Sequence, residues 1–300
     1  MTDAAAAKTG QPKTRALGKT DLQVSPLGVG TNKWSQGSND EAVFETFQTF
    51  QNAGISFFDT AEVYGFGKSE RLIGDCLRRD GRPATIATKF APFIARSSSR
   101  HLLKALDASL ARLGVKTIDL YYIHFPYPFA DFNELADAMI EAVKAGKVRH
   151  VGVSNFSATQ MRRVADRLSR SNIPLAANEV HYSLLARKPE SNGVLDACRE
   201  LGASLIAYFP LARGRLTRPP TQGKTGRLET LQKTLTDIAQ AHRASPSQVA
   251  LNWLLARDPC IIPIPGASTA KNAKQNIAAL DWSLTGDEFA AIDAVSASWR

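Results

Sequence analysis

Cysteine is scarce in this chain, which has three cysteines among 300 residues, Cys76, Cys198 and Cys260. They lie far apart and form no CxxC pair, so we expect neither a disulfide framework nor a cysteine-bound zinc ion. Free thiols are typical of a reducing compartment, and the sequence therefore predicts a cytoplasmic protein. Long hydrophobic runs are also lacking. No uninterrupted apolar stretch approaches the roughly 18 residues that a membrane-spanning helix needs, so we expect no membrane association.

Metal and nucleotide motifs are incomplete as well. The five histidines stand singly, without the HExxH spacing of a zinc enzyme, and we predict no metal site. Three glycine-containing segments each lack one glycine of the motif they resemble, which excludes a P-loop, a hydrolase nucleophile elbow and a Rossmann fingerprint in turn. These segments are Gly65-Phe66-Gly67-Lys68-Ser69, Gly152-Val153-Ser154-Asn155-Phe156 and Gly28-Val29-Gly30.

The chain carries a formal net charge of +9, but its basic residues are scattered along helix-like stretches and one loop. This pattern predicts a solvated surface that attracts a polyanionic small molecule, and no nucleic-acid partner. Residues 1–13 are rich in alanine and polar residues and lack the apolar core of a secretory signal. We predict a disordered N-terminal tail there, with a tag remnant or a transit segment as alternatives, followed by one domain over residues 14–300.

Short hydrophobic segments recur about every thirty residues, which is the length of one strand–helix unit. Eight such strands alternating with helices predict an α/β fold, a single-domain (β/α)8 TIM barrel. The predicted strands are Leu27–Gly30, Phe57–Asp59, Ile86–Lys89, Ile118–His124, Val148–Ser154, Leu175–Glu179, Ser204–Tyr208 and Ile261–Ile264.

Two features lie outside this repeat. Arg15–Leu17 and Leu22–Val24 flank a short turn and predict an N-terminal β-hairpin that plugs the bottom of the barrel. The interval before the last strand is about twice as long as the others, so we expect extra helices before or after that strand. We predict a mobile basic loop over Arg213–Arg227 and helices over Asp237–His242 and Pro246–Arg257, the last with Ser245 as its cap.

Polar residues end four of the predicted strands: Asp59, Lys89, His124 and the pair Ser154-Asn155. The C-terminal ends of parallel barrel strands face one mouth, so these side chains are expected to converge on one site. Tyr64 follows the first of them. A tyrosine is a poor acid at neutral pH, but a nearby ammonium held by a carboxylate lowers its pKa. We therefore predict Tyr64 as the acid that protonates a substrate carbonyl, Lys89 and Asp59 as its activating pair, and His124 as a second hydrogen-bond donor.

A carbonyl that gains a proton must also gain an electron pair, and a reduced nicotinamide is the natural source where no flavin or metal motif is present. Ser154 and Asn155 offer hydrogen bonds for its carboxamide, and Tyr208 offers a flat face for its ring. Gly266-Ala267-Ser268 precedes a helix and supplies backbone N–H groups for a phosphate, with Lys271 and Lys274 nearby.

The residues quoted resemble those of the aldo-keto reductases over nearly the whole chain. The similar segments are FFDTAEVYG at Phe57–Gly65, Ala87-Thr88-Lys89-Phe90, Ile123-His124, Gly152-Val153-Ser154-Asn155, AYFPL at Ala207–Leu211 and Ile264-Pro265-Gly266. The resemblance implies a (β/α)8 barrel and NADPH-dependent reduction of aldehydes or ketones to alcohols, with Asp59, Tyr64, Lys89 and His124 as the catalytic four. It also implies that the cofactor contacts Asp59 and further residues, namely Gly30, Thr31, Ser154, Asn155, Glu179, Tyr208, Phe209, Pro210, Leu211, Arg213, Gly214, Gly266, Ala267, Ser268, Asn272, Gln275 and Asn276.

Several of these positions depart from the usual family pattern. Glu179 stands where relatives often carry glutamine for the carboxamide, and Phe209 stands where many carry serine. Gly266-Ala267 and Asn272 replace a Lys-Ser pair and an arginine of NADPH-selective members, so NADH is the alternative cofactor. The glycine form is similar to the bacterial and plant branch that includes pyridoxal reductases and potassium-channel β subunits.

The predicted substrate is a small carbonyl compound, preferably an aldehyde, and an apolar pocket for it is expected from Trp34, Phe90, Phe125 and Tyr127. The alternatives are a Schiff-base aldolase with Lys89 as nucleophile, or a nicotinamide-sensing regulatory subunit with little turnover. Taken singly, Asp59 and Lys89 are equally consistent with a structural ion pair, and His124 and Tyr208 with core packing. We expect a monomer or a small homo-oligomer.

Overall fold

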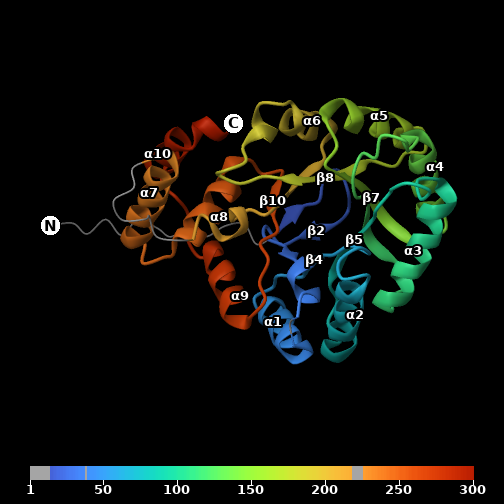
Figure 1. The fold of residues 1–300 in the computed structure, drawn as a ribbon, viewed down its shortest axis with the longest axis horizontal. Coiled ribbons are helices and arrows are strands. Elements are labelled where there is room, and N and C mark those ends of the chain that lie inside the picture. Colours follow the sequence, from blue (N-terminus) through green and yellow to red (C-terminus); the bar gives the residue numbers. More distant parts are fainter. Residues whose placement is uncertain (1–13, 38, 218–225) are drawn as a thin grey trace.

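The computed structural model describes residues 14–37, 39–217 and 226–300. Eight parallel strands form one sheet in the order of the chain, which confirms the predicted barrel fold (Figure 1). They are β3 (Val29–Gly30), β4 (Phe57–Asp59), β5 (Thr85–Phe90), β6 (Ile118–Ile123), β7 (Val148–Ser154), β8 (Leu175–His181), β9 (Ser204–Tyr208) and β10 (Ile261–Pro263).

The first and last strands meet and close the barrel. Gly30 forms a parallel bridge with Gly266, and the Gly28 N–H donates to the Pro263 carbonyl at 2.9 Å. Glycine is needed at this seam, because a Cβ on Gly30 would lie 2.9 Å from the Ile264 carbonyl oxygen, just after β10. The backbones of β3 and β10 can therefore approach only where side chains are absent.

A ring of helices surrounds the strands, and two further helices, α7 and α10, lie outside that ring (Figure 1). The helices of the ring follow successive strands and are α1 (Asp40–Asn52), α2 (Lys68–Asp80), α3 (Ser99–Leu113), α4 (Phe132–Lys144), α5 (Ala158–Ser169), α6 (Val194–Leu201), α8 (Pro246–Arg257) and α9 (Ala270–Ile277). The extra pair is α7 (Arg227–Ala241) before the last strand and α10 (Gly286–Val295) after it. No helix in the described ranges is long and apolar enough to cross a membrane.

The hairpin fills the bottom of the barrel, as predicted. Its strands β1 (Arg15–Ala16) and β2 (Gln23–Val24) pair antiparallel. Leu17, Leu22 and Val24 are buried in one hydrophobic cluster with inward-facing barrel residues such as Leu120 and Ile206. The same burial that stabilises the hairpin therefore closes the barrel at the end opposite its mouth.

The helix predicted over Asp237–His242 was placed too late. The structure begins α7 at Arg227 and ends it at Ala241, with Leu231, Leu235 and Ile238 buried on one face. Of the predicted basic loop, residues 218–225 lie outside the described residues, and Ala212–Gly214 form the 3-10 turn η3. The helix predicted over Pro246–Arg257 is confirmed, and Ser245 caps it in a capping box with Gln248.

Candidate active site at the mouth of the barrel

A cavity of about 950 Å³ opens at the C-terminal ends of the strands. It brings together most of the residues that the sequence predicted from segments up to 246 positions apart. Its walls include Gly30, Thr31, Asp59, Tyr64, His124, Phe125, Ser154, Asn155, Glu179, Tyr208, Phe209, Pro210, Leu211, Arg213, Gly214, Gly266, Asn272, Gln275 and Asn276. In the described residues no group of three or more histidine, cysteine, aspartate or glutamate side chains is placed to hold a metal ion.

Three ionisable side chains meet at the floor of this cavity. Asp59 ends β4, Lys89 lies near the end of β5 and Glu179 lies in β8, and all three are buried. The Lys89 ammonium makes a short ion pair with Asp59 Oδ1 and donates to the Thr60 carbonyl at 2.8 Å. Its Nζ also lies 3.1 Å from Glu179 Oε2. Two carboxyl groups therefore share one ammonium.

Burial and mutual charge set the protonation of this group. Burial, together with the charge of Asp59, raises the pKa of Glu179 to about 8 against the attraction of Lys89. Burial likewise raises the pKa of Asp59, although Lys89 opposes the shift. For Lys89, burial favours the neutral amine, but the charges of Asp59 and Glu179 outweigh it and raise its pKa. Lys89 is thus cationic at neutral pH.

Tyr64 and His124 stand above this floor. The Tyr64 ring centroid lies 5.3 Å from Lys89 Nζ and 6.0 Å from the His124 ring, which it meets edge-on. Burial and the neighbouring charge of Lys89 lower the pKa of His124 to about 3, so its imidazole is neutral at physiological pH. Burial raises the pKa of Tyr64, and the two carboxyl groups add to that shift. Lys89 does act to lower it, as predicted, but the net direction is the opposite of the sequence prediction.

A hydrogen-bond chain fixes the ends of β7 and β8 beside the ionisable group. Tyr208 Oη donates to Asn155 Oδ1 at 2.9 Å, and Asn155 Nδ2 donates to the His124 carbonyl at 3.2 Å. Ser154 Oγ donates to the Glu179 carbonyl at 3.0 Å. Asn155 adopts φ +62°, a left-handed conformation that asparagine tolerates better than most residues. Asn155 therefore links Tyr208 to the backbone of His124, and Ser154 is bonded to the backbone of Glu179.

One positioning contact was missed by the sequence reasoning. The His181 ring stacks on Tyr208 at a centroid distance of 5.4 Å and an interplanar angle of 10°. His181 ends β8, so its place at a strand end was the available signal. Lys33, Gln36, Thr217 and Ser247 also line the cavity without having been predicted.

Part of the predicted substrate pocket does not reach the cavity. Trp34 is fully buried and its indole N–H donates to the Ala267 carbonyl at 2.7 Å, which also keeps Ala267 in the core. Phe90 is fully buried beneath the Arg96 guanidinium. Tyr127 packs edge-on against Phe129, outside the cavity wall. Of the four predicted pocket aromatics, Phe125 lines the cavity, and it stacks on His124 at 4.4 Å.

Asp59 Oδ2 and His124 Nδ1 are buried without a hydrogen-bond partner in the described part of the chain, and Glu179 Oε2 has the shared Lys89 ammonium beside it. Unpaired buried polar atoms are costly, and their residues all line the same cavity. The aromatic face of Tyr208, the amide of Asn155 and the N-terminus of α9 line or border that cavity as well. This donor and acceptor set fits a nicotinamide dinucleotide better than it fits a metal ion.

Comparisons with known proteins agree with this geometry. The sequence profile of the Aldo/keto reductase family matches residues 26–297. The chain is 33% identical over 300 residues to the chloroplastic pyridoxal reductase of Arabidopsis thaliana, covering 89% of this chain and 82% of that protein. It is 34% identical to the 6-dehydroglucose reductase of Novosphingobium aromaticivorans, with 90% of each chain covered.

Solved structures show the same likeness. A thermostable aldo-keto reductase in complex with the inhibitor epalrestat superposes with a TM-score of 0.82 at 33% identity, covering 94% of this chain and 99% of that one. The glycerol dehydrogenase of Gluconobacter oxydans superposes with a TM-score of 0.83 at 27% identity, with 95% of each chain covered.

Proposed function

Because the chain belongs to the aldo/keto reductase family of oxidoreductases, we propose that it reduces aldehydes to alcohols with NADPH and uses Tyr64 as the general acid. The observation that carries the proposal is the buried Lys89–Asp59 pair directly beneath Tyr64 and beside a neutral His124. Proton transfer to a carbonyl oxygen requires an acid beside a buried ammonium of this kind. An ion pair that serves only as a solvated surface contact does not require burial beneath a tyrosine.

The cavity walls suit the cofactor at both of its ends. Ser154, Asn155 and Glu179 would hold the carboxamide, and Tyr208 would stack on the nicotinamide ring. Arg213 and the N-terminus of α9 would receive the phosphates. A bound nicotinamide supplies the hydride for the carbonyl carbon. We favour NADPH over NADH because Arg213 and Lys33 bring positive charge to the cavity wall.

The chain's own residues would manage the proton. Tyr64 would donate its hydroxyl proton to the substrate oxygen, and the Lys89 ammonium would stabilise the phenolate that remains. His124, neutral and therefore a donor on one ring nitrogen, would orient the same oxygen. Asp59 would keep Lys89 charged and in place. Since that charge makes Lys89 a poor nucleophile, the Schiff-base aldolase alternative loses its support.

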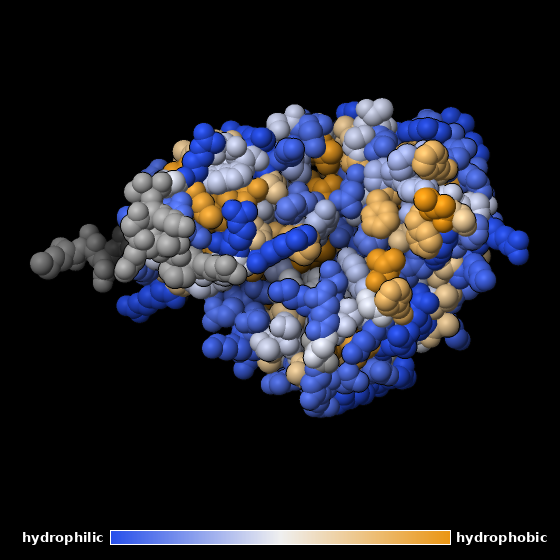
Figure 2. All heavy atoms as spheres, in the orientation of Figure 1, coloured by the Kyte–Doolittle hydropathy of each residue, from blue (hydrophilic) through white to orange (hydrophobic). Residues whose placement is uncertain are grey.

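Apolar side chains on the loops beside the cavity favour an aromatic aldehyde as substrate. The large hydrophobic residues that are exposed in the described ranges all follow β4, β5 or β6, and they are Val63, Phe66, Phe93, Ile94, Phe125 and Phe129. Figure 2 shows a group of hydrophobic side chains on one side of the central hollow, over the part of the ring that holds α2, α3 and α4. Phe125 belongs both to this group of exposed hydrophobic residues and to the cavity wall. The part of a flat apolar substrate that lies farthest from the reacting carbonyl would therefore cover the group.

The proposal is tested by replacing Tyr64 with phenylalanine and following NADPH oxidation with an activated aromatic aldehyde. We expect turnover to fall by about 10²- to 10⁴-fold, the usual worth of a positioned acid, while NADPH binding persists. Tyr121→Phe is the matched control, because Tyr121 is fully buried in the hydrophobic core and does not line the cavity, and it should turn over normally. Full activity in Tyr64→Phe would contradict the assignment of the acid. Tight NADPH binding without turnover in the wild type would favour the regulatory-subunit alternative.

The cytoplasmic location remains a proposal that rests on the three free cysteines. Oligomeric state stays a prediction of a monomer or small homo-oligomer.

A further inference from the structure

We infer that Glu179 makes this site discriminate between oxidised and reduced nicotinamide, since its carboxyl group is a second acidic group facing the single ammonium of Lys89. The inference rests on the proposed function and deepens it.

Glu179 is fixed where it can affect the ring. Its side chain is buried and lines the cavity. Its backbone carbonyl accepts from the Ser154 hydroxyl at 3.0 Å and from the Asn155 N–H at 2.8 Å. The end of β8 is therefore bonded to the two residues that are expected to hold the carboxamide, and Glu179 lies beside them.

The buried charge beside the ring depends on one proton. Lys89 contributes one positive charge and Asp59, its short-contact partner, one negative charge. Glu179 Oε2 lies 3.1 Å from the same ammonium, as a second carboxyl group facing it. The floor of the cavity is therefore neutral when the two carboxyl groups hold one proton between them, and it carries one negative charge when Glu179 and Asp59 are both ionised.

That proton is exchanged in an accessible pH range. Burial and the charge of Asp59 raise the pKa of Glu179 to about 8, against the pull of Lys89. The other titratable groups facing it are the phenols of Tyr64, Tyr122 and Tyr208, from the loop after β4 and from β6 and β9. Burial raises the pKa of each of them, and the charge of Glu179 adds to the shift. They stay neutral. Burial also raises the pKa of Asp59, which shares the Lys89 ammonium with Glu179, so these two carboxyl groups bind and release the proton as a pair.

The two redox states of the cofactor respond differently to this charge. The oxidised nicotinamide ring is a cation and the reduced ring is neutral, whereas the phosphates are the same in both. An ionised Glu179 in a buried site attracts the cation and leaves the neutral ring largely unaffected. As the pH rises, the affinity for NADP⁺ should therefore increase relative to the affinity for NADPH. By linkage, NADP⁺ binding should release a proton from Glu179.

At neutral pH the protonated acid takes the place of an amide. It has one O–H donor and one C=O acceptor, so it can serve the carboxamide in the way that glutamine would. In alkaline solution the ionised Glu179 binds the oxidised cofactor more tightly. The oxidised cofactor therefore dissociates more slowly after the substrate has been reduced. Glu179 is thus a specificity-determining residue for the redox state of the cofactor.

The experiment is fluorescence titration of wild type and Glu179→Gln with NADP⁺ and with NADPH at about pH 6.5 and about pH 9. The measured quantity is the ratio of the two dissociation constants, in which effects on the phosphates cancel. In the wild type we expect the ratio of the NADP⁺ constant to the NADPH constant to fall at least about tenfold across this range, as one buried unit charge predicts. In Glu179→Gln it should change by less than about twofold, because the amide does not ionise.

Glu288→Gln provides the matched control, since Glu288 lies on α10 and does not line the cavity. It should retain the pH dependence of the wild type. Calorimetry of NADP⁺ binding to the wild type in two buffers of different ionisation enthalpy gives a second readout, in which proton release supports the inference without any variant.

The outcomes separate the two proposals. A wild-type ratio that does not change with pH, or the same change in Glu179→Gln as in the wild type, would overturn the inference while leaving the reductase intact. Failure of the wild type to bind either cofactor would instead overturn the proposed function.

Discussion

The buried carboxyl group of Glu179 should cost the folded protein stability as the pH rises. The pKa of Glu179 is about 8 in the folded chain, against an ordinary value of 4.5. The folded state therefore holds a proton that the unfolded chain releases between those values. Because the folded pKa is the higher one, the contribution of Glu179 to stability is fully present below about pH 4.5 and is lost as the pH rises through about 8.

Glu179→Gln should consequently stabilise the protein in a pH-dependent way. Glutamine does not ionise, so the variant escapes the loss that the wild type suffers as the pH rises. We expect the melting temperature of the variant to exceed that of the wild type at about pH 8.5 by a few degrees, roughly 2–4 °C per kcal/mol, and to approach it at about pH 5. Thermal unfolding followed by circular dichroism at both pH values checks this. Equal differences at the two pH values would mean that Glu179 does not titrate between them.

That the candidate site residues converge on one cavity could be predicted from sequence, but their electrostatics could not. Asp59, Lys89 and His124 stand near or at the ends of strands, and barrel geometry sends such residues to one mouth. The sign of the Tyr64 pKa shift depends on how deeply the phenol is buried and on a carboxyl group from a distant strand, Glu179. Neither quantity has a sequence signal. Trp34 was misplaced for a related reason: an aromatic residue after a strand can turn into the core as readily as into the cavity.

At the scale of elements, loss of the packing of the N-terminal hairpin should lower the stability of the whole barrel. Leu17 is fully buried among inward-facing residues of the sheet. Leu17→Ala would leave a cavity at the closed end of the barrel, and we expect a loss of about 2–5 kcal/mol in the free energy of unfolding. Gln23→Ala is the control on the same hairpin, because the Gln23 side chain is exposed, and it should cost less than about 0.5 kcal/mol. Chemical denaturation measures both, and similar losses for the two variants would show that the hairpin is not part of the core.

Strands proved easier to predict than the long connection before the last strand. A buried parallel strand has a continuous hydrophobic run, such as Ile118–Ile123 in β6, and its length separates it from a helix. The first half of α7 carries polar residues between Leu231 and Leu235, and its N-terminus lacks a side-chain cap. Without a cap and after a Pro- and Gly-rich segment, the start of that helix had no local signal. Its apolar face is explained by packing against α8 and α10, which the sequence does not reveal.

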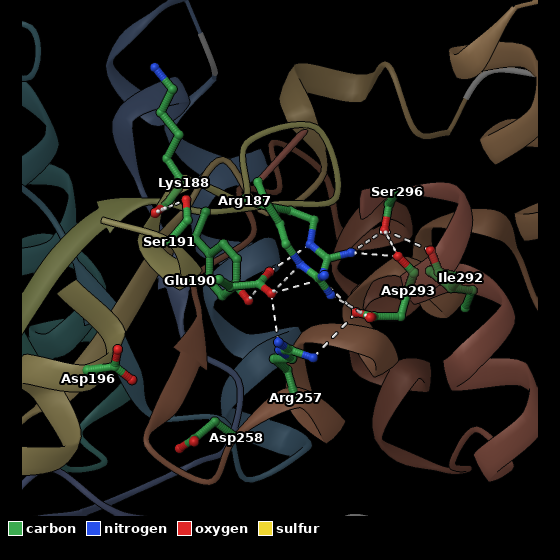
Figure 3. Close-up of polar contacts among 12 residues, drawn as sticks. Arg187, Lys188, Glu190, Ser191, Asp196, Arg257, Asp258, Ile292, Asp293 and Ser296 are labelled. Atoms are coloured by element: carbon green, nitrogen blue, oxygen red, sulfur yellow. Dashed lines mark hydrogen bonds and ion pairs between the residues drawn. The ribbon is translucent and has the colours of Figure 1, made fainter. Parts of the chain in front are cut away.

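At the scale of the whole molecule, a buried ion cluster fastens the C-terminal segment to the barrel (Figure 3). Arg187, in the loop after β8, is fully buried and lies over the Trp253 ring of α8. Its guanidinium pairs with Glu190 at 2.7 Å and with Asp293 of α10 at 2.6 Å. Its backbone N–H donates to the Trp299 carbonyl at 2.8 Å. The Arg187 side chain thus joins the loop after β8 to α8 and α10, and its backbone holds the segment that follows α10.

Replacing Arg187 with methionine should therefore destabilise the folded protein without changing the residues that line the active-site cavity. The variant leaves Glu190 and Asp293 with less compensation, and breaking a buried pair from one side costs about 3–5 kcal/mol. Burial opposes ionisation of both carboxyl groups, but the Arg187 guanidinium outweighs it and lowers the pKa of each. A carboxyl group whose pKa is lowered in the folded state stabilises the protein at pH values above its ordinary pKa. This contribution is lost as the pH falls. The stability difference between wild type and Arg187→Met should accordingly be largest near neutral pH and shrink below about pH 4.

Arg300→Met is the matched control for this prediction. Arg300 contacts the same two carboxyl groups, but its side chain is 38% exposed, and an exposed pair of this kind contributes about 0–1 kcal/mol. Urea denaturation of the three proteins at about pH 7 and about pH 4 measures the differences. A loss for Arg187→Met that is no larger than that for Arg300→Met, or that does not shrink in acid, would mean that hydrophobic contacts around Trp253 hold the C-terminal segment. If the ion cluster does hold it, NADPH affinity should survive in Arg187→Met at temperatures where the variant is folded, because Arg187 does not line the cavity.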